Sequence, residues 1–209
     1  SPVYPIAAFW RIFSMAETTT TLEPLPIVAY GDPVLREPGE DISQDYPDLQ
    51  QLIDQMFATM YHAHGVGLAA PQIGLGIRLF VIDATGLKER AEADEQVEVK
   101  QVFINPEILD ETGDDWPFEE GCLSIPGIRE KVSRQAEVRI RYYDREWVEH
   151  EETYTGVVAR VIQHEYDHIE GVLFTDHISP LRKQLIRGKL KQIQRGRVDV
   201  DYPMRFARE

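Results

Sequence analysis

The sequence predicts an α+β fold, in which helices and an antiparallel β-sheet occupy separate stretches of one chain. Apolar residues recur every three or four positions over 49–60 and again over 181–193, which is the spacing of amphipathic helices. Between them, β-branched runs at 77–83, 102–104 and 137–143 predict strands. The later strand connections are too short for crossover helices, so we expect an antiparallel meander.

Composition places the chain among globular proteins that bury one core. Its 209 residues are 43% hydrophobic, and the sequence has no apolar run of about 18 residues that would cross a membrane. The single cysteine, Cys122, excludes an internal disulfide framework and favours a reducing compartment. We therefore expect a cytoplasmic protein.

Charge is distributed unevenly along the chain. Lys and Arg total 22 against 36 Asp and Glu, and this net charge of −14 disfavours general nucleic-acid binding, specific DNA binding included. From Arg182 to the C-terminus, nine basic residues stand against three acidic ones, a net charge of +6. A basic tail on an acidic body indicates one localised anionic partner, although a solvated basic helix face gives the same pattern.

The N-terminal region divides at residue 24. Residues 1–24 have no hydrophobic period, so we interpret them as a flexible extension, within which Met15 is an alternative start. Residues 25–209 form the single predicted domain. It begins with an extended arm broken by prolines, and Gly65 is the residue we expect to end the first helix in the left-handed conformation.

The middle of the chain alternates strands with polar connections. The charged stretch 86–101 is predicted to be a solvated excursion between strands, and Asn105-Pro106 to end the strand that follows it. Strand 137–143 is expected to pair with residues 151–154.

Cys122 stands in a loop in the prediction. It follows Gly121 and precedes Pro126 and Gly127, residue types that favour turns. A lone cysteine is more commonly a small buried hydrophobic residue, but a thiol presented at a turn is available for reaction or metal binding.

A helix over 157–170 carries the motif His164-Glu165-Tyr166-Asp167-His168, with Gly171 at its end. Two histidines four positions apart lie on one helix face, and the glutamate beside the first can reach a water between them, as in metal-dependent hydrolases. The alternative is a solvated helix that carries two histidines by chance. A last helix begins at about residue 179.

Three protein ligands are needed for a catalytic metal, and the third is not on this helix. The extended pattern His-Glu-x-x-His-x-x-Gly-x-x-His fails because Phe174 occupies its final position. His177 lies further downstream, beyond a predicted strand. Cys122 offers a soft thiolate, and one Cys with two His leaves a fourth position open for water.

Three motifs in this sequence resemble those of the peptide deformylases, which remove the formyl group from N-formylmethionine at the start of new bacterial polypeptides. They read Gly65-Val66-Gly67-Leu68-Ala69-Ala70-Pro71-Gln72, Glu120-Gly121-Cys122-Leu123-Ser124 and Gln163-His164-Glu165-Tyr166-Asp167-His168. The resemblance covers about residues 25–195. It implies antiparallel β-sheets wrapped around a central metal-binding helix, with one helix near each end of the domain.

The resemblance also implies a mechanism. Cys122, His164 and His168 bind one metal ion, and Glu165 takes a proton from the water bound to it. The resulting hydroxide attacks the formyl carbon, and Glu165 then returns the proton to the leaving amine, so that formate is released. Ferrous iron is the expected physiological metal, with zinc, nickel or cobalt as substitutes that the same ligands accept.

Further residues receive roles by the same resemblance. The side-chain amide of Gln72 and the backbone N–H of Leu123 stabilise the oxyanion. The substrate peptide is expected to contact Val66, Gly67, Phe118, Gly121, Arg129, Val157 and Val161. Arg160 aligns with the apolar wall of the methionine pocket, and we expect it to extend toward solvent at the rim.

Two other functional hypotheses fit parts of this pattern. One is a metalloprotease that cleaves internal peptide bonds, and the other is a binding module with a purely structural zinc. The partners implied by the deformylase resemblance are N-formylmethionyl nascent peptides and, through the basic C-terminal helix, the ribosome, which some family members contact in this way.

Overall fold

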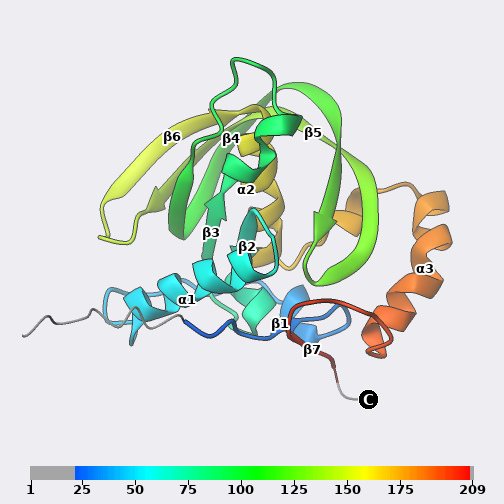
Figure 1. Cartoon of the computed structure of the whole chain (residues 1–209). Coiled ribbons are helices and arrows are strands. Elements are labelled where there is room, and N and C mark those ends of the chain that lie inside the picture. Colours follow the sequence, from blue (N-terminus) through cyan, green and yellow to red (C-terminus); the bar gives the residue numbers. More distant parts are fainter. Residues whose placement is uncertain (1–21, 208–209) are drawn as a thin grey trace, which may run out of the picture.

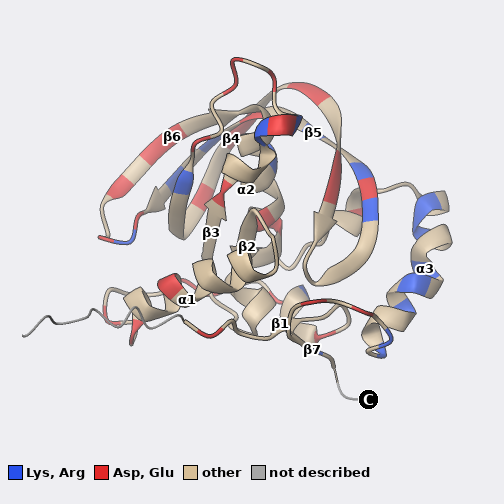
Figure 2. Cartoon of the chain, in the orientation of Figure 1, with Lys and Arg blue, Asp and Glu red and all other residues tan. Residues whose placement is uncertain are grey.

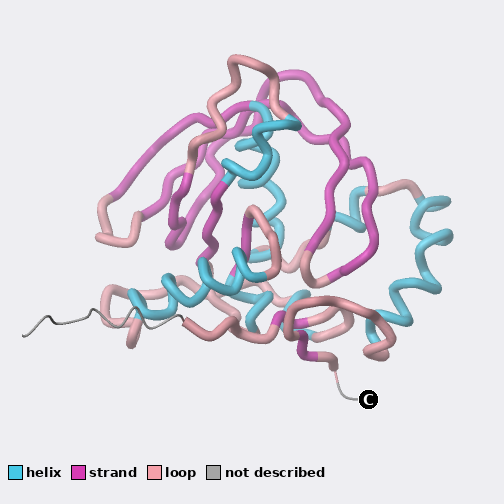
Figure 3. The backbone as a smooth tube through the Cα atoms, in the orientation of Figure 1, coloured by secondary structure: helices cyan, strands magenta, loops and turns pink. Residues whose placement is uncertain are grey.

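The computed structural model describes residues 22–207, and it confirms the α+β prediction. A five-stranded sheet in the order β2-β3-β4-β5-β6, antiparallel throughout, curves around the helix α2 (Figure 1; Figure 3 shows the strands in magenta). The strands are β2 (Gly67–Ala69), β3 (Leu79–Asp83), β4 (Lys100–Cys122), β5 (Ile125–Tyr143) and β6 (Glu149–Thr155). The extension predicted over residues 1–24 lies almost wholly outside the described range.

Helices and a second sheet complete the fold. The α-helices are α1 (Leu49–His62), α2 (Gly156–Ile169) and α3 (Pro180–Gln194), and 3-10 helices are η1 (Pro33–Arg36), η2 (Ala70–Ile73), η3 (Ala84–Arg90) and η4 (Phe174–His177). Two short strands, β1 (Ile27–Val28) and β7 (Met204–Arg205), pair in parallel and join the two ends of the described chain. Within the described residues no helix is long and apolar enough to cross a membrane.

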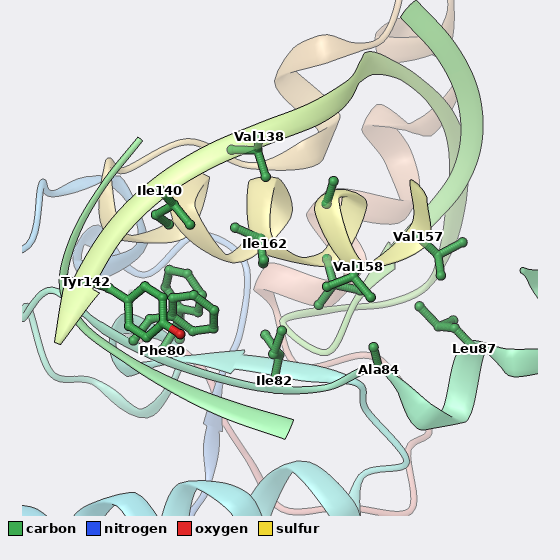
Figure 4. Packing of buried hydrophobic residues seen from close by; sticks show 14 of the residues in the cluster. Phe80, Ile82, Ala84, Leu87, Val138, Ile140, Tyr142, Val157, Val158 and Ile162 are labelled. Carbon is green, nitrogen blue, oxygen red and sulfur yellow. The ribbon is translucent and has the colours of Figure 1, made fainter. Parts of the chain in front are cut away.

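The core lies on both faces of β3. Phe80 and Ile82 point into a cluster with α2, whereas Leu79 and Val81 point into a second cluster with α1. This burial on both faces explains why the strand is continuously apolar instead of alternating. Figure 4 shows the first cluster, in which Val138 and Ile140 of β5 lie over Val158 and Ile162 of α2.

The stretch 86–101 is less solvated than its charge predicted. Leu87 and Val97 are buried against the α2 cluster, at 8% and 4% exposure. The carboxylate of Glu95 accepts a hydrogen bond from the Val157 N–H, which is an unpaired donor in the first turn of α2. Acidic residues interact favourably with a helix N-terminus, so this charged segment helps to fix the start of the central helix.

Two predicted ends of elements were wrong. The left-handed residue after α1 is His64, with a φ of 58°, and not Gly65. The strand beginning at Lys100 does not end at Asn105-Pro106 but continues to Cys122, with a register shift between Ile104 and Glu107 where Asn105 takes a φ of 47°. Pro106 has no backbone N–H to donate to the neighbouring strand. It is tolerated here because the irregular pairing at the bulge requires no donor from that residue.

The C-terminal helix α3 buries only part of its apolar stripe. Ile186 and Ile193 are buried in a third cluster that includes Ile125 and Phe174, but Leu181 and Leu185 are 65% and 60% exposed. The helix also carries lysines and arginines, which form the largest group of blue segments in Figure 2. The chain then returns along the bottom of the molecule to β7 (Figure 1).

Candidate active site

Helix α2 and the end of β4 bring together three side chains of the types that can bind a metal ion. His164 and His168 are one turn apart on α2, and their ring centroids are 5.1 Å apart. The Cys122 thiol lies 3.3 Å from Nε2 of His168, and the three ligating atoms lie within 4.8 Å of one another. Sequence pattern alone could not establish this meeting, because Cys122 is more than 40 residues from either histidine.

Cys122 is placed differently from the predicted loop. It is the last residue of β4 and pairs with Ile125, the first residue of β5, so that only Leu123 and Ser124 form the hairpin loop. Pro126 lies inside β5 and does not close a longer loop. The thiol is half-buried, and its residue is the last paired position of the strand.

A buried carboxylate orients the first histidine. Nδ1 of His164 lies 2.8 Å from Oε1 of Glu120, which leaves Nε2 as the ring nitrogen available to a metal. Glu120 also accepts two hydrogen bonds from Arg134 and one from Arg160. Burial would raise the pKa of Glu120, but the hydrogen bonds from His164 and Arg134 hold it well below its usual range.

Arg160 was predicted to extend to the rim, and this prediction was wrong. The side chain is 2% exposed. Its guanidinium donates to Glu120, to the Val132 carbonyl at 2.8 Å and to the Trp116 carbonyl at 2.6 Å, and it lies over the ring of Trp116. The ionised Glu120 supplies the opposite charge that makes burial of an arginine tolerable at this position.

The side chains that converge here fit a divalent transition metal. One thiolate and two imidazoles form a donor set typical of Zn²⁺ and Fe²⁺ sites, and three protein ligands leave a position open. Burial lowers the pKa of His168 well below its usual value, which keeps that ring neutral and able to ligate. Burial also acts to lower the pKa of His164, but contact with Cys122 and Glu120 raises it instead.

Glu165 lies in the same pocket with one oxygen free. Its side chain is 4% exposed, and Oε2 has no hydrogen-bond partner among the described residues. Burial raises the pKa of Glu165 to about 7, the range in which a carboxyl group exchanges protons efficiently near neutral pH. The carboxylate packs directly on Gly67, where a Cβ atom would lie only 2.6 Å from Oε1.

Gln72 faces Cys122. Its Oε1 accepts a hydrogen bond from the Ala69 N–H at 2.9 Å, and this fixes which end of the amide points inward. The Nε2 group then donates to Ser124 Oγ at 3.2 Å and approaches Cys122 Sγ at 3.4 Å. An amide donor therefore stands beside the open side of the ligand cluster.

A cavity of about 1110 Å³ opens above these residues. Its walls include most of the predicted substrate contacts: Val66, Gly67, Phe118, Gly121, Arg129 and Val161, together with Gln72 and Leu123. Val157 is not among the lining residues. It is buried in the core near Leu87 (Figure 4), because the first turn of α2 faces the sheet and not the cavity.

Several residues of the site carried no individual signal in the sequence. Arg134 lies on β5 and reaches Glu120 across the long hairpin, a contact that only strand register determines. The cavity is also lined by Val198, Asp199, Val200, Asp201 and Tyr202, which follow the C-terminal helix. Glu120 could have been suggested by its position two residues before Cys122, inside the same motif.

Comparison with known proteins agrees with this geometry. The family model for polypeptide deformylase matches residues 24–184. Peptide deformylases of Christiangramia forsetii and Flavobacterium johnsoniae are each 55% identical, over 187 and 188 residues, which is 87% and 88% of this chain and 95% and 96% of theirs. The crystal structure of a peptide deformylase from Legionella pneumophila superimposes with a TM-score of 0.72 at 41% identity, covering 83% of this chain and 96% of that one. The chain therefore belongs to the polypeptide deformylase family, the enzymes that remove the formyl group from an N-terminal formylmethionine.

Proposed function

We propose that this enzyme hydrolyses the formyl amide with one divalent cation held by Cys122, His164 and His168. The observation that supports this most directly is the convergence of the three ligating atoms within 4.8 Å at the base of the cavity. When bound, such an ion supplies Lewis acidity, which lowers the pKa of a coordinated water from about 15.7 toward about 7. The family match argues against the protease and binding-module alternatives.

Glu165 is the proton carrier in this proposal. Its unpaired Oε2 accepts the proton of the attacking water, and the raised pKa allows the carboxylic acid then to donate that proton to the leaving amine nitrogen. Both transfers use one group because Glu165 lines the same cavity as His164. The packing against Gly67 restrains the side chain during both transfers.

Two hydrogen-bond donors are assigned to the developing oxyanion. These are the Nε2 amide of Gln72 and the backbone N–H of Leu123, which belong to η2 and to the β4–β5 loop. Because Ala69 already fixes the orientation of the Gln72 amide, this donor requires little reorganisation when charge develops. Loss of one such donor costs about 3 to 4 kcal/mol of barrier in comparable sites.

The methionine side chain is proposed to occupy the apolar part of the cavity. Val66, Phe118 and Val161 line that part, while Gly67 and Gly121 leave room for the substrate backbone. Arg129 is exposed at the cavity wall, where it can meet residues further along the peptide. Val157 is omitted because it lies in the core.

Replacement of Glu165 tests the mechanism. We expect Glu165→Gln to retain its metal but to release formate from a formyl-methionyl tripeptide at least about 100 times more slowly than the wild type. Elemental analysis and a formate assay on the same anaerobic preparation measure both quantities. Glu170→Gln, near the end of the same helix and outside the cavity, is the matched control. Wild-type turnover in Glu165→Gln would refute the mechanism.

Ferrous iron is proposed as the physiological metal. The half-buried thiolate and two imidazoles accept Fe²⁺, Zn²⁺, Ni²⁺ and Co²⁺, so the donor set does not select among them. If iron is the native ion, exposure to air inactivates the enzyme, because either the iron or Cys122 is oxidised. Metal analysis and activity after anaerobic and aerobic purification distinguish iron from zinc, which has no redox chemistry.

Ribosome contact through α3 is proposed as a second, separate property. Lys183, Arg187 and Lys191 line one groove of about 660 Å³, so three cations converge on one surface, whereas Arg36 in the same groove pairs with Asp176 at 2.6 Å. Arg182 is excluded from this surface because it pairs with the buried Glu130 at 2.7 Å. RNA phosphate is the anionic partner that such a surface would bind on the ribosome, with salt-sensitive affinity.

Charge reversal tests this ribosome binding better than truncation does. Removing the helix would expose the hydrophobic cluster into which Ile186 and Ile193 pack, and it would leave the buried Glu130 without its partner Arg182. We expect Lys183→Glu combined with Lys191→Glu to weaken co-sedimentation with ribosomes. The plot of log binding constant against log salt concentration should also become less steep, by about 0.7 to 0.9 for each RNA phosphate that the variant no longer neutralises. Lys88→Glu, on η3, is the control. Unchanged co-sedimentation of the double variant would exclude ribosome binding through this surface.

A further inference from the structure

The C-terminal tail, residues 196–207, returns from α3 to the active site. Gly196 turns the chain with a φ of 74°, and β7 then pairs with β1 through bonds from Ile27 N–H to the Pro203 carbonyl and from Ala29 N–H to the Arg205 carbonyl, 2.9 and 2.8 Å long. In Figure 1 the tail is the red arc that ends beside β1. Between the turn and β7, the tail forms one wall of the substrate cavity.

One side chain of the tail holds the active-site hairpin. The hydroxyl of Tyr202 donates to the carbonyl oxygen of Leu123 at 2.7 Å. The neighbouring Ser124 carbonyl accepts from the Tyr30 N–H at 2.9 Å, and Ser124 Oγ accepts from Gln72 at 3.2 Å. The two-residue loop is therefore attached to three segments that lie outside the hairpin.

These attachments bear on the geometry of the reaction. The Leu123 N–H and carbonyl lie on opposite sides of a single Cα, so restraint of the carbonyl limits rotation of the residue that presents the N–H. The preceding residue, Cys122, is held by its pairing with Ile125, but the loop itself has no ladder partner. Without the Tyr202 hydroxyl, one of its two carbonyls would lose its protein donor.

We propose that Tyr202 is a positioning residue for deformylation, which aligns the Leu123 N–H with the formyl oxygen. This inference rests on the proposed function, in which that N–H stabilises the oxyanion. The second sheet, β1 with β7, then serves the active site: Tyr30 follows one of its strands and Tyr202 precedes the other, and each donates to one carbonyl of the loop.

The test compares three variants of the metal-loaded, full-length enzyme with the wild type. Tyr202→Phe removes only the hydroxyl, and replacement of Tyr202 by 4-aminophenylalanine restores a donor at the same place. Tyr46→Phe is the matched control, because Tyr46 packs against the same hydrophobic cluster and its hydroxyl has no hydrogen-bond partner within residues 22–207. Each variant is assayed for formate release from a formyl-methionyl tripeptide, with metal content measured in parallel.

We expect Tyr202→Phe to lower kcat about tenfold with KM within about twofold of the wild type, less than the 10²- to 10³-fold loss caused by deleting an oxyanion donor. The amino variant should recover most of this loss, and Tyr46→Phe should lose none. Amide hydrogen exchange should accelerate in the peptide that contains Leu123 while the rest of the protein is unchanged.

Three results would overturn the inference. They are a Tyr202→Phe enzyme as active as Tyr46→Phe, a loss of activity fully explained by lost metal, and a loss that the amino variant does not reverse. Failure of the proposed function has a different signature, because Glu165→Gln would then retain activity. With Glu165→Gln inactive and Tyr202→Phe unaffected, only the role of Tyr202 is refuted.

Discussion

The buried guanidinium of Arg160 can be tested by replacement with methionine. Arg160→Met keeps much of the apolar stem but removes the hydrogen bonds to Glu120, Val132 and Trp116. Glu120 keeps three of its four donors, so its charge remains compensated. The substitution therefore measures the contribution of one arginine to the network and does not leave an isolated carboxylate.

The expected loss follows from the groups left unpaired. The Val132 carbonyl belongs to a fully buried residue, and an unsatisfied buried acceptor costs about 1 to 3 kcal/mol. Loss of one charge-assisted bond to Glu120 costs about 1.5 to 3 kcal/mol. The variant no longer buries the unpaired Nε of Arg160, which offsets part of this cost. We expect a net destabilisation of about 3 kcal/mol.

Urea unfolding at a fixed excess of one divalent ion measures this difference. For a domain of this length, about 3 kcal/mol corresponds to a decrease in Tm of roughly 6 to 12 °C. Arg139→Met is the control, because Arg139 forms its ion pair with Glu151 at the surface, where each side chain is about half exposed. Such pairs contribute about 1 kcal/mol or less. Equal destabilisation by the two variants would show that the buried network does not stabilise the fold.

Three further predictions concern the site and the stability of the domain. Gly67→Ala should lower kcat at least about 100-fold with a smaller effect on Tm, because the new Cβ would lie 2.6 Å from Oε1 of Glu165 and displace the proposed proton carrier. Normal turnover in steady-state kinetics at full metal occupancy would contradict this prediction. Hydrogen bonding to Asp144 raises the pKa of His150, and Glu152 also faces that ring. Because the pKa is higher in the folded state, the stabilisation by this pair is complete below about pH 6.5, the pKa of a histidine in the unfolded chain. It is lost as the pH rises through the raised pKa of the folded state. The difference in unfolding free energy between wild type and His150→Gln should therefore shrink as the pH rises above about 6.5, and a constant difference would argue against the pairing. Chelation of the metal should abolish formate release and lower Tm, because an ion that binds only the folded state stabilises that state. Activity that survives complete metal removal would contradict a metal-dependent reaction.

Local patterns predicted most of the secondary structure. The period of α1 and α3, the apolar run of β3 and the pairing of β5 with β6 follow from spacing along neighbouring residues, and the structure shows each of them. The wrong predictions occurred where a distant segment decides the conformation. The charged residues of 86–101 indicated solvent exposure, yet the Glu95 carboxylate accepts a hydrogen bond from the Val157 N–H at the start of α2.

The sequence by itself determined the family and the set of chemical groups, because the spacing of His164 and His168 on a helix is a local property and the motif around Cys122 is short and specific. Only the tertiary structure decided how these groups meet and what supports them. Arg160 is buried because Glu120, on another strand, supplies its counter-charge. Tyr202 reaches Leu123 because β7 pairs with β1 at the opposite end of the chain. Contacts of this range depend on strand register and helix docking, which arise when the whole core packs together and leave no periodic trace among adjacent residues.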